Sequence, residues 1–102
     1  MLIIHNINQN RFETEVSGGI AYIAYEFSGD VMNLFTTFVP PKARHQGIAF
    51  ALVEFALVYA KTEHFKVIDG CPTVTIFIEK HPEYKSVLAT DKDEMNTLEQ
   101  TR

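Results

Sequence analysis

Two short stretches of this 102-residue chain carry residue types suited to chemistry. The first runs from Val39 to Ala49 and has two cationic side chains, Lys42 and Arg44, just ahead of Gly47 and a long apolar run. Backbone N–H groups at a helix start lack internal partners and concentrate partial positive charge, so they attract anions such as a pyrophosphate. A glycine there has no Cβ to hold a phosphate away. The pattern therefore indicates an anion-binding loop, although a basic, solvated loop before an ordinary core helix explains the same residues.

The second stretch centres on Cys71, the only cysteine of the chain, which stands directly before Pro72. A cysteine whose pKa is lowered can act as a nucleophile through its thiolate, which would make Cys71 a catalytic residue. Free cysteine is also among the most buried residue types, and in that case it acts as a small hydrophobic packing residue. The sequence leaves both interpretations open.

Composition argues against several other classes of protein. A net charge of −4 and a pI near 5.5 provide no basic footprint for nucleic acid. One cysteine and four scattered histidines form no metal-ligand motif, and they allow no internal disulfide. The first residues lack signal-peptide features, and the longest apolar run, Ile48 to Ala60, is shorter than the roughly 20 residues that span a bilayer. We expect a cytoplasmic protein with no metal and no membrane partner, and we expect it to be a monomer.

The first forty residues predict an antiparallel meander. Short runs of alternating or β-branched and aromatic residues are separated by turn formers such as Ser17-Gly18-Gly19. The predicted strands are Leu2 to Ile7, Arg11 to Val16, Ile20 to Phe27 and Val31 to Val39.

A change of pattern at Pro40-Pro41 ends the last of these strands, because two prolines remove two backbone donors. Gly47 to Lys61 then predicts a helix that is apolar around most of its circumference and belongs in the middle of a domain. Lys66 to Asp69 predicts a further strand. A strand, loop, helix and strand in this order form a crossover, so the two strands should run parallel.

The length of the chain suits one domain. We expect an α+β fold with a mixed sheet over residues 1–89, and a polar tail or loose helix over residues 90–102.

Residues Arg44 to Ala49, RHQGIA, resemble the Arg/Gln-x-x-Gly-x-Gly/Ala motif of the GCN5-related N-acetyltransferases, which follows a strand and opens a helix. The segments 37–41, 70–74 and 79–84 also look like a minimal, single-domain branch of that superfamily, the YjdJ-type N-acetyltransferases. The resemblance covers roughly residues 11–88, and several ordered motifs that agree are more specific than one loop.

This resemblance implies an acetyl-CoA-dependent enzyme that acetylates a small amine or an exposed lysine. It implies that the two parallel strands splay apart around the pantetheine arm, and that the acetyl carbonyl meets backbone N–H groups near Phe38 and Val39. It also implies that residues 73–80 form a short helix begun by the Cys-Pro pair, against their β-branched composition. The residues expected to bind the cofactor are Phe38, Val39, Lys42, Arg44, His45, Gln46, Gly47, Ile48 and Ala49.

The chain departs from these relatives at two positions. Thr36-Thr37 replaces a His-Thr pair that is common in the branch, so a candidate general base is missing. His45 replaces the first glycine of the phosphate loop and brings a Cβ and an imidazole to it. Two alternatives therefore stay open: a catalytically weak protein that binds or senses acyl-CoA, and a small interaction domain without a ligand.

Overall fold

The computed structural model describes residues 1–90, which form a five-stranded sheet in the order β1-β2-β3-β4-β5. The first four strands pair antiparallel, whereas β5 pairs parallel to β4. The α+β class, the meander and the parallel crossover are thus confirmed, although the first strand is shorter than predicted. The strands are β1 (Ile4–Asn6), β2 (Arg11–Val16), β3 (Gly19–Ser28), β4 (Val31–Phe38) and β5 (Lys66–Ile68).

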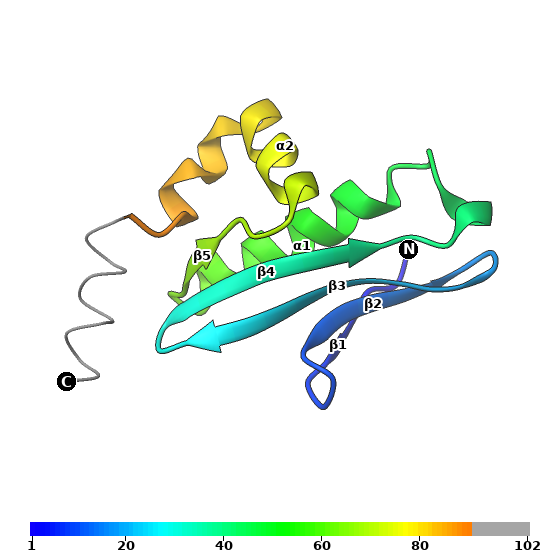
Figure 1. The fold of residues 1–102 in the computed structure, drawn as a ribbon, viewed down its shortest axis with the longest axis horizontal. Coiled ribbons are helices and arrows are strands. Elements are labelled where there is room, and N and C mark those ends of the chain that lie inside the picture. Colours follow the sequence, from blue (N-terminus) through cyan, green and yellow to red (C-terminus); the bar gives the residue numbers. More distant parts are fainter. Residues whose placement is uncertain (91–102) are drawn as a thin grey trace.

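Two helices and two 3-10 turns complete the described chain, and both helices lie on the same side of the sheet (Figure 1). The helices are α1 (Ile48–Thr62) and α2 (Pro72–Lys80), and the 3-10 turns are η1 (Pro41–Ala43) and η2 (Pro82–Val87). Of the predicted tail, only Thr90 belongs to the described residues; the rest of that prediction lies outside them.

The helix predicted for residues 73–80 is confirmed. Pro72 occupies the first turn, where its missing N–H costs nothing, and Cys71 before it is extended. Val74, Phe77 and Ile78 are buried, which is the i, i+3, i+4 spacing of one helix face. Burial of that face outweighs the strand preference of the β-branched residues.

Helix α1 lies on one face of the sheet and contacts β2, β3, β4 and β5. Its buried side is built from small and branched residues such as Leu52, Val53 and Ala56. Beside that buried side, Val58 is 46% exposed, and Phe55 is 40% exposed although its ring touches Phe12. The expectation of a helix in the middle of the domain was therefore too strong, because part of α1 stays in contact with solvent.

Strand register decides which residues face α1. Directly opposed residues share a face of the sheet. Phe12, Ile23 and Thr37 are opposed across β2, β3 and β4, and this row faces α1. The neighbouring row, which contains Tyr22 and Phe38, therefore faces away from both helices. Position 37 thus belongs to the helix side of the sheet, and position 38 to the open side.

The parallel pair is short, and its strands part after three residues. β5 pairs with Val31–Asn33 only, so within the described residues β4 continues to Phe38 without a strand partner on that side. At the point where they part, Gly70 lies so close to β4 that a Cβ there would overlap the side-chain oxygen of Asn33. That oxygen is buried and, among the described residues, has no hydrogen-bond partner. We call this opening, between β4 beyond Asn33 and the chain from Gly70 into α2, the split.

Candidate cofactor and catalytic site

The loop between β4 and α1 is held by its own backbone. Pro40 and Pro41 begin η1, in which the Ala43 N–H donates to the Pro40 carbonyl over 2.9 Å. The Arg44 side chain folds back, and its Nε donates to the Val39 carbonyl over 3.0 Å. The remaining guanidinium N–H groups stay available at the surface of the loop, because Arg44 itself is exposed.

Helix α1 begins without the usual side-chain cap. Its N-cap residue is Gly47, in the left-handed conformation with φ 79°, and no side chain donates to or accepts from this end. The first turn also contains no acidic residue that would compete for the free N–H groups. A Cβ at Gly47 would meet no atom within 4 Å, so the space beside it is open. The helix start therefore presents unpaired donors and partial positive charge to an accessible space.

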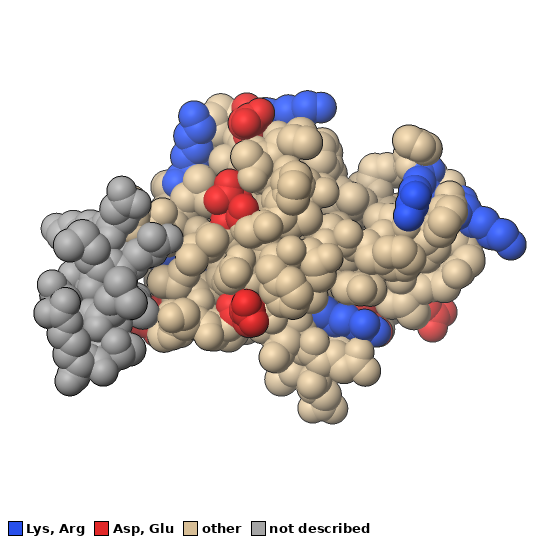
Figure 2. Space-filling view, viewed as in Figure 1, with Lys and Arg blue, Asp and Glu red and all other residues tan. Residues whose placement is uncertain are grey.

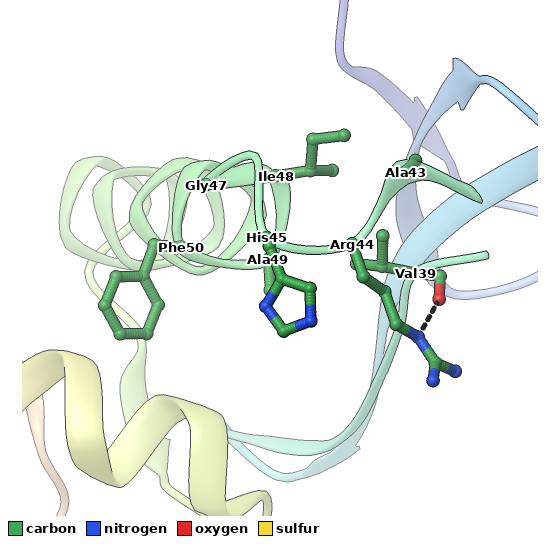
Figure 3. Close-up of a pocket in the computed structure, with 8 residues that line it drawn as sticks. All are labelled: Val39, Ala43, Arg44, His45, Gly47, Ile48, Ala49 and Phe50. Atoms are coloured by element: carbon green, nitrogen blue, oxygen red, sulfur yellow. Dashed lines mark hydrogen bonds between the residues drawn. The ribbon is translucent and has the colours of Figure 1, made fainter. Parts of the chain in front are cut away.

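A cavity of about 520 Å³ lies against this helix start (Figure 3). The side chains of His45 and Phe50 project to the same side of it, whereas that of Ile48 points the other way. His45 adopts φ 66°, a left-handed conformation that is unfavourable for a residue with a Cβ. The lining residues are Val39, Ala43, Arg44, His45, Gly47, Ile48, Ala49 and Phe50.

Six of the nine predicted cofactor residues line this cavity, and the other three do not. Phe38 lies on the open side of the sheet, 5.7 Å from the Tyr22 ring, so only its backbone can face the split. Lys42 is exposed, with its Cβ beside Gly18, and Gln46 is exposed in the same loop. The structure thus gathers the loop and the helix start around one space; their binding of a cofactor stays a prediction.

Cys71 lies across the split from β4. It is buried, 7% exposed, and its thiol donates to the Thr37 hydroxyl with Sγ and Oγ1 3.5 Å apart. Burial raises the pKa of the Cys71 thiol. Once deprotonated, however, the sulfur can accept hydrogen bonds from the hydroxyls of Thr37 and Thr73 and from the N–H groups of Thr73 and Val74, and these outweigh burial, so the net pKa is lowered. Both interpretations of the sequence therefore keep support, since the Cys71 thiol is packed and its pKa is also lowered.

Reasoning from the sequence missed two residues. The sequence marks Thr37 only as the neighbour of a missing histidine, yet the strand register places it on the side that faces α1. Phe50 falls within the predicted core helix, but it is only partly buried and lines the cavity. Its position in the sequence could have identified Phe50 as a cavity residue, because it lies in the first turn of α1, three residues after Gly47.

Charged side chains near the site lie in small, separate groups (Figure 2). Figure 2 shows basic side chains at the end of the molecule that carries the β4–α1 loop and others at the edge that carries α2, where acidic side chains also lie. No group of three or more potential metal ligands is found within the described residues. None of the described helices is long and apolar enough to cross a membrane.

Comparison with known proteins gives two findings. The family model of the GCN5-related N-acetyltransferases matches residues 11–87. The fold is similar to the NMR solution structure of a GCN5-like protein from Staphylococcus aureus, with a TM-score of 0.68 and 23% sequence identity over 86% of this chain and 87% of that one. At this identity the second finding concerns the fold alone.

Fold and site together define a small α+β domain in which a split parallel strand pair leads to a helix with an open N-terminus. The family match covers most of the chain and includes every residue of the loop, the helix start and the split. The chain belongs to the GCN5-related N-acetyltransferases.

Proposed function

We propose that this protein transfers the acetyl group of acetyl-CoA to an amine. The start of α1 is the observation that supports this proposal most strongly. Gly47, the uncapped first turn and the adjacent cavity together suit the binding of a diphosphate. The split suits the remainder of the cosubstrate, because the free edge of β4 offers backbone groups to an extended pantetheine arm.

In this proposal Val39, Arg44 and the N–H groups from Gly47 to Ala49 hold the nucleotide end of acetyl-CoA. The backbone N–H groups near Phe38 and Val39 polarise the acetyl carbonyl, which becomes negatively charged as it is attacked. The thioester then lies between β4 and Cys71 on the helix side of the sheet.

Cys71 is the proposed catalytic residue. Its thiolate attacks the acetyl carbonyl, coenzyme A leaves as the thiolate, and the acetyl group becomes bonded to Sγ. A neutral amine then attacks this new thioester, loses a proton to solvent and regenerates the Cys71 thiolate. The acceptor is a small amine or an exposed lysine.

We place this activity in a monomer of the cytoplasm. A free thiol is the ordinary state of cysteine in a reducing compartment, and one cysteine cannot form an internal disulfide. Sedimentation equilibrium tests the monomer, and a concentration-dependent mass would contradict it.

The test of function is release of coenzyme A from acetyl-CoA in the presence of a panel of amines. Turnover on at least one amine is expected. Thermal stabilisation by acetyl-CoA without turnover on any amine would contradict transfer and leave a binding protein, because a ligand that binds only the native state raises its stability.

The role of Cys71 is tested with Cys71→Ala and Thr37→Val. In a single turnover without amine, mass spectrometry should find one acetyl group on Cys71 in the wild type and none in Cys71→Ala. Thr37→Val should raise the pKa of the Cys71 thiol and slow its alkylation near neutral pH, because a hydrogen bond to the thiolate is lost. Unchanged turnover in Cys71→Ala would show that the amine attacks acetyl-CoA directly and that Cys71 is a packing residue.

The second candidate, a catalytically weak protein that binds acyl-CoA, is favoured by Thr36. The register opposes Thr36 to Ala24 on the open side of the sheet, and a hydroxyl there does not act as a base at neutral pH. If lack of a base limits transfer, Thr36→His should increase the rate of coenzyme A release. An unchanged rate would remove this support.

A further inference from the structure

Phe50 and Lys80 meet at the side of the cavity that faces α2. Phe50 is the third residue of α1, and Lys80 is the last residue of α2. The Lys80 ammonium lies 5.5 Å from the centroid of the Phe50 ring. Phe77 of α2 packs edge-on against the same ring with the centroids 5.4 Å apart, so the ring is held between the two helices. The ammonium is thereby kept near the cavity by an aromatic ring.

Lys80 takes part in no ion pair among the described residues. It is exposed, and the ion pairs of the described residues join Arg11 with Glu13 and His81 with Glu83. A cation over an aromatic ring at the wall of a cavity is available to a second, anionic partner, which it can bind as a compact point charge.

We infer that Lys80 binds the 3′-phosphate of coenzyme A and makes the site selective for cosubstrates that carry this group. The inference rests on the proposed function. Coenzyme A has two separate anionic groups, the diphosphate and a phosphomonoester on the ribose that carries adenine. The diphosphate belongs at Gly47, and Phe50 lies three residues further, about 4.5 Å along the helix axis. The ribose and its phosphate therefore reach the level of Phe50 and Lys80 when the diphosphate lies at the helix start.

Of the two loop cations, Arg44 is placed for the diphosphate, whereas Lys42 lies outside the cavity. Arg44 has its Nε bonded to the Val39 carbonyl on the strand side of the cavity, and Lys42 extends beside Gly18. Lys80 approaches from α2, on the far side of Phe50. Two anionic groups of one ligand are thus matched by cations on two different elements. Phe50 between them offers a flat face on which adenine can stack.

The experiment measures the dissociation constants of coenzyme A and 3′-dephospho-coenzyme A by calorimetry at low ionic strength, for three proteins. The wild type should bind coenzyme A about tenfold more tightly, as expected for one charge-assisted contact. Lys80→Gln should lose this preference and bind dephospho-coenzyme A as the wild type does. The matched control is Lys61→Gln, which removes the last-turn lysine of α1 instead and should keep the preference.

Equal binding of both nucleotides by the wild type would overturn the inference and leave the proposed function standing. If Lys80→Gln kept the preference for coenzyme A, the inference would also be overturned and the proposed function would stand, because another group would then bind the 3′-phosphate. Failure of both nucleotides to bind the wild type would overturn the proposed function and the inference with it. Lys80 is exposed, so circular dichroism should show that both variants fold.

Discussion

Two regions of this molecule are stabilised in different ways. The first, which we call the aromatic cluster, is made of rings in contact between β1, β2, β3 and α1. The second is the split with the adjoining β4–α1 loop, where the chain leaves regular structure and encloses a cavity. The members of the aromatic cluster are His5, Phe12, Tyr25, Phe55 and Tyr59.

Side-chain packing dominates the aromatic cluster. Phe12 is fully buried, and its ring lies between 4.3 and 5.6 Å from the rings of the other four members. The split depends instead on backbone geometry, namely the positive φ of His45 and Gly47 and the close approach of Gly70 to β4. The aromatic cluster therefore stabilises the fold, whereas the split gives up part of that stability so that the site stays open.

The largest expected effect is that of Phe12→Ala on the free energy of unfolding. Loss of a fully buried ring should lower it by about 3 to 5 kcal/mol. Urea denaturation measures this, with Phe35→Ala as the control, because Phe35 is 43% exposed, lies outside the aromatic cluster and should cost much less. Phe12→Leu serves as a milder variant if Phe12→Ala does not fold. Equal losses in the two alanine variants would contradict the importance of the cluster.

Gly70→Ala should come next, because its Cβ would overlap the Asn33 side chain where β4 and β5 part. We expect a loss of about 1 to 3 kcal/mol in the free energy of unfolding. Asn33→Ala removes the overlapping oxygen, so the double variant should recover part of the loss, and Asn33→Ala alone should cost little because that oxygen has no partner in the described structure. Additive effects in this double-mutant cycle would show that the two residues do not meet.

His45→Gly and His64→Gly form a matched pair. Both histidines have positive φ, 66° and 62°, but His45 lines the cavity and His64 follows the end of α1. Each change should raise the free energy of unfolding by about 0.5 to 1 kcal/mol, since glycine tolerates this conformation.

The pair separates strain from binding. Only His45→Gly should alter the dissociation constant of coenzyme A, because only His45 faces the proposed ligand. If both variants changed it equally, the assignment of the cavity would be wrong. If neither gained stability, the positive φ at these positions would not be strained.

The smallest expected effect is the pH dependence caused by His5. Its imidazole lies 2.6 Å from the Tyr25 hydroxyl, and burial lowers the pKa of His5 from its ordinary value of 6.5. The unfolded chain therefore binds a proton more readily, so this contribution to stability is complete above about pH 6.5 and is lost as the pH falls through the lowered pKa. Urea denaturation between about pH 8 and about pH 5 should show a shallower loss in His5→Gln than in the wild type. Identical slopes would contradict this contribution.

Much of the fold follows from local patterns in the sequence. Strand Arg11–Val16 has the predicted bounds, because a strict alternation decides both its register and its ends. Pro40-Pro41 marks the end of β4, and Gly47 marks the start of α1, because each residue restricts or frees the backbone in a known way. Helix α2 was predicted only through resemblance to a family, since its β-branched residues favour a strand.

The site was less predictable from the same patterns. The contact between Cys71 and Thr37 joins residues 34 positions apart, and it depends on where two strands part, which no local pattern encodes. The fold of the β4–α1 loop also decides which cations line the cavity, and it brings Arg44 there but leaves Lys42 outside. The exposed part of α1 was unforeseen because composition does not tell how many neighbours a helix has.

The most direct test of the account compares its two regions in one measurement. Amide chemical shifts recorded by NMR during titration with coenzyme A report every backbone N–H separately. The amides from Arg44 to Phe50 should shift strongly, and those of His5, Phe12 and Tyr25 should stay nearly unchanged. Shifts confined to the aromatic cluster, with Gly47 and its neighbours unaffected, would contradict the claim that the open start of α1 binds the diphosphate.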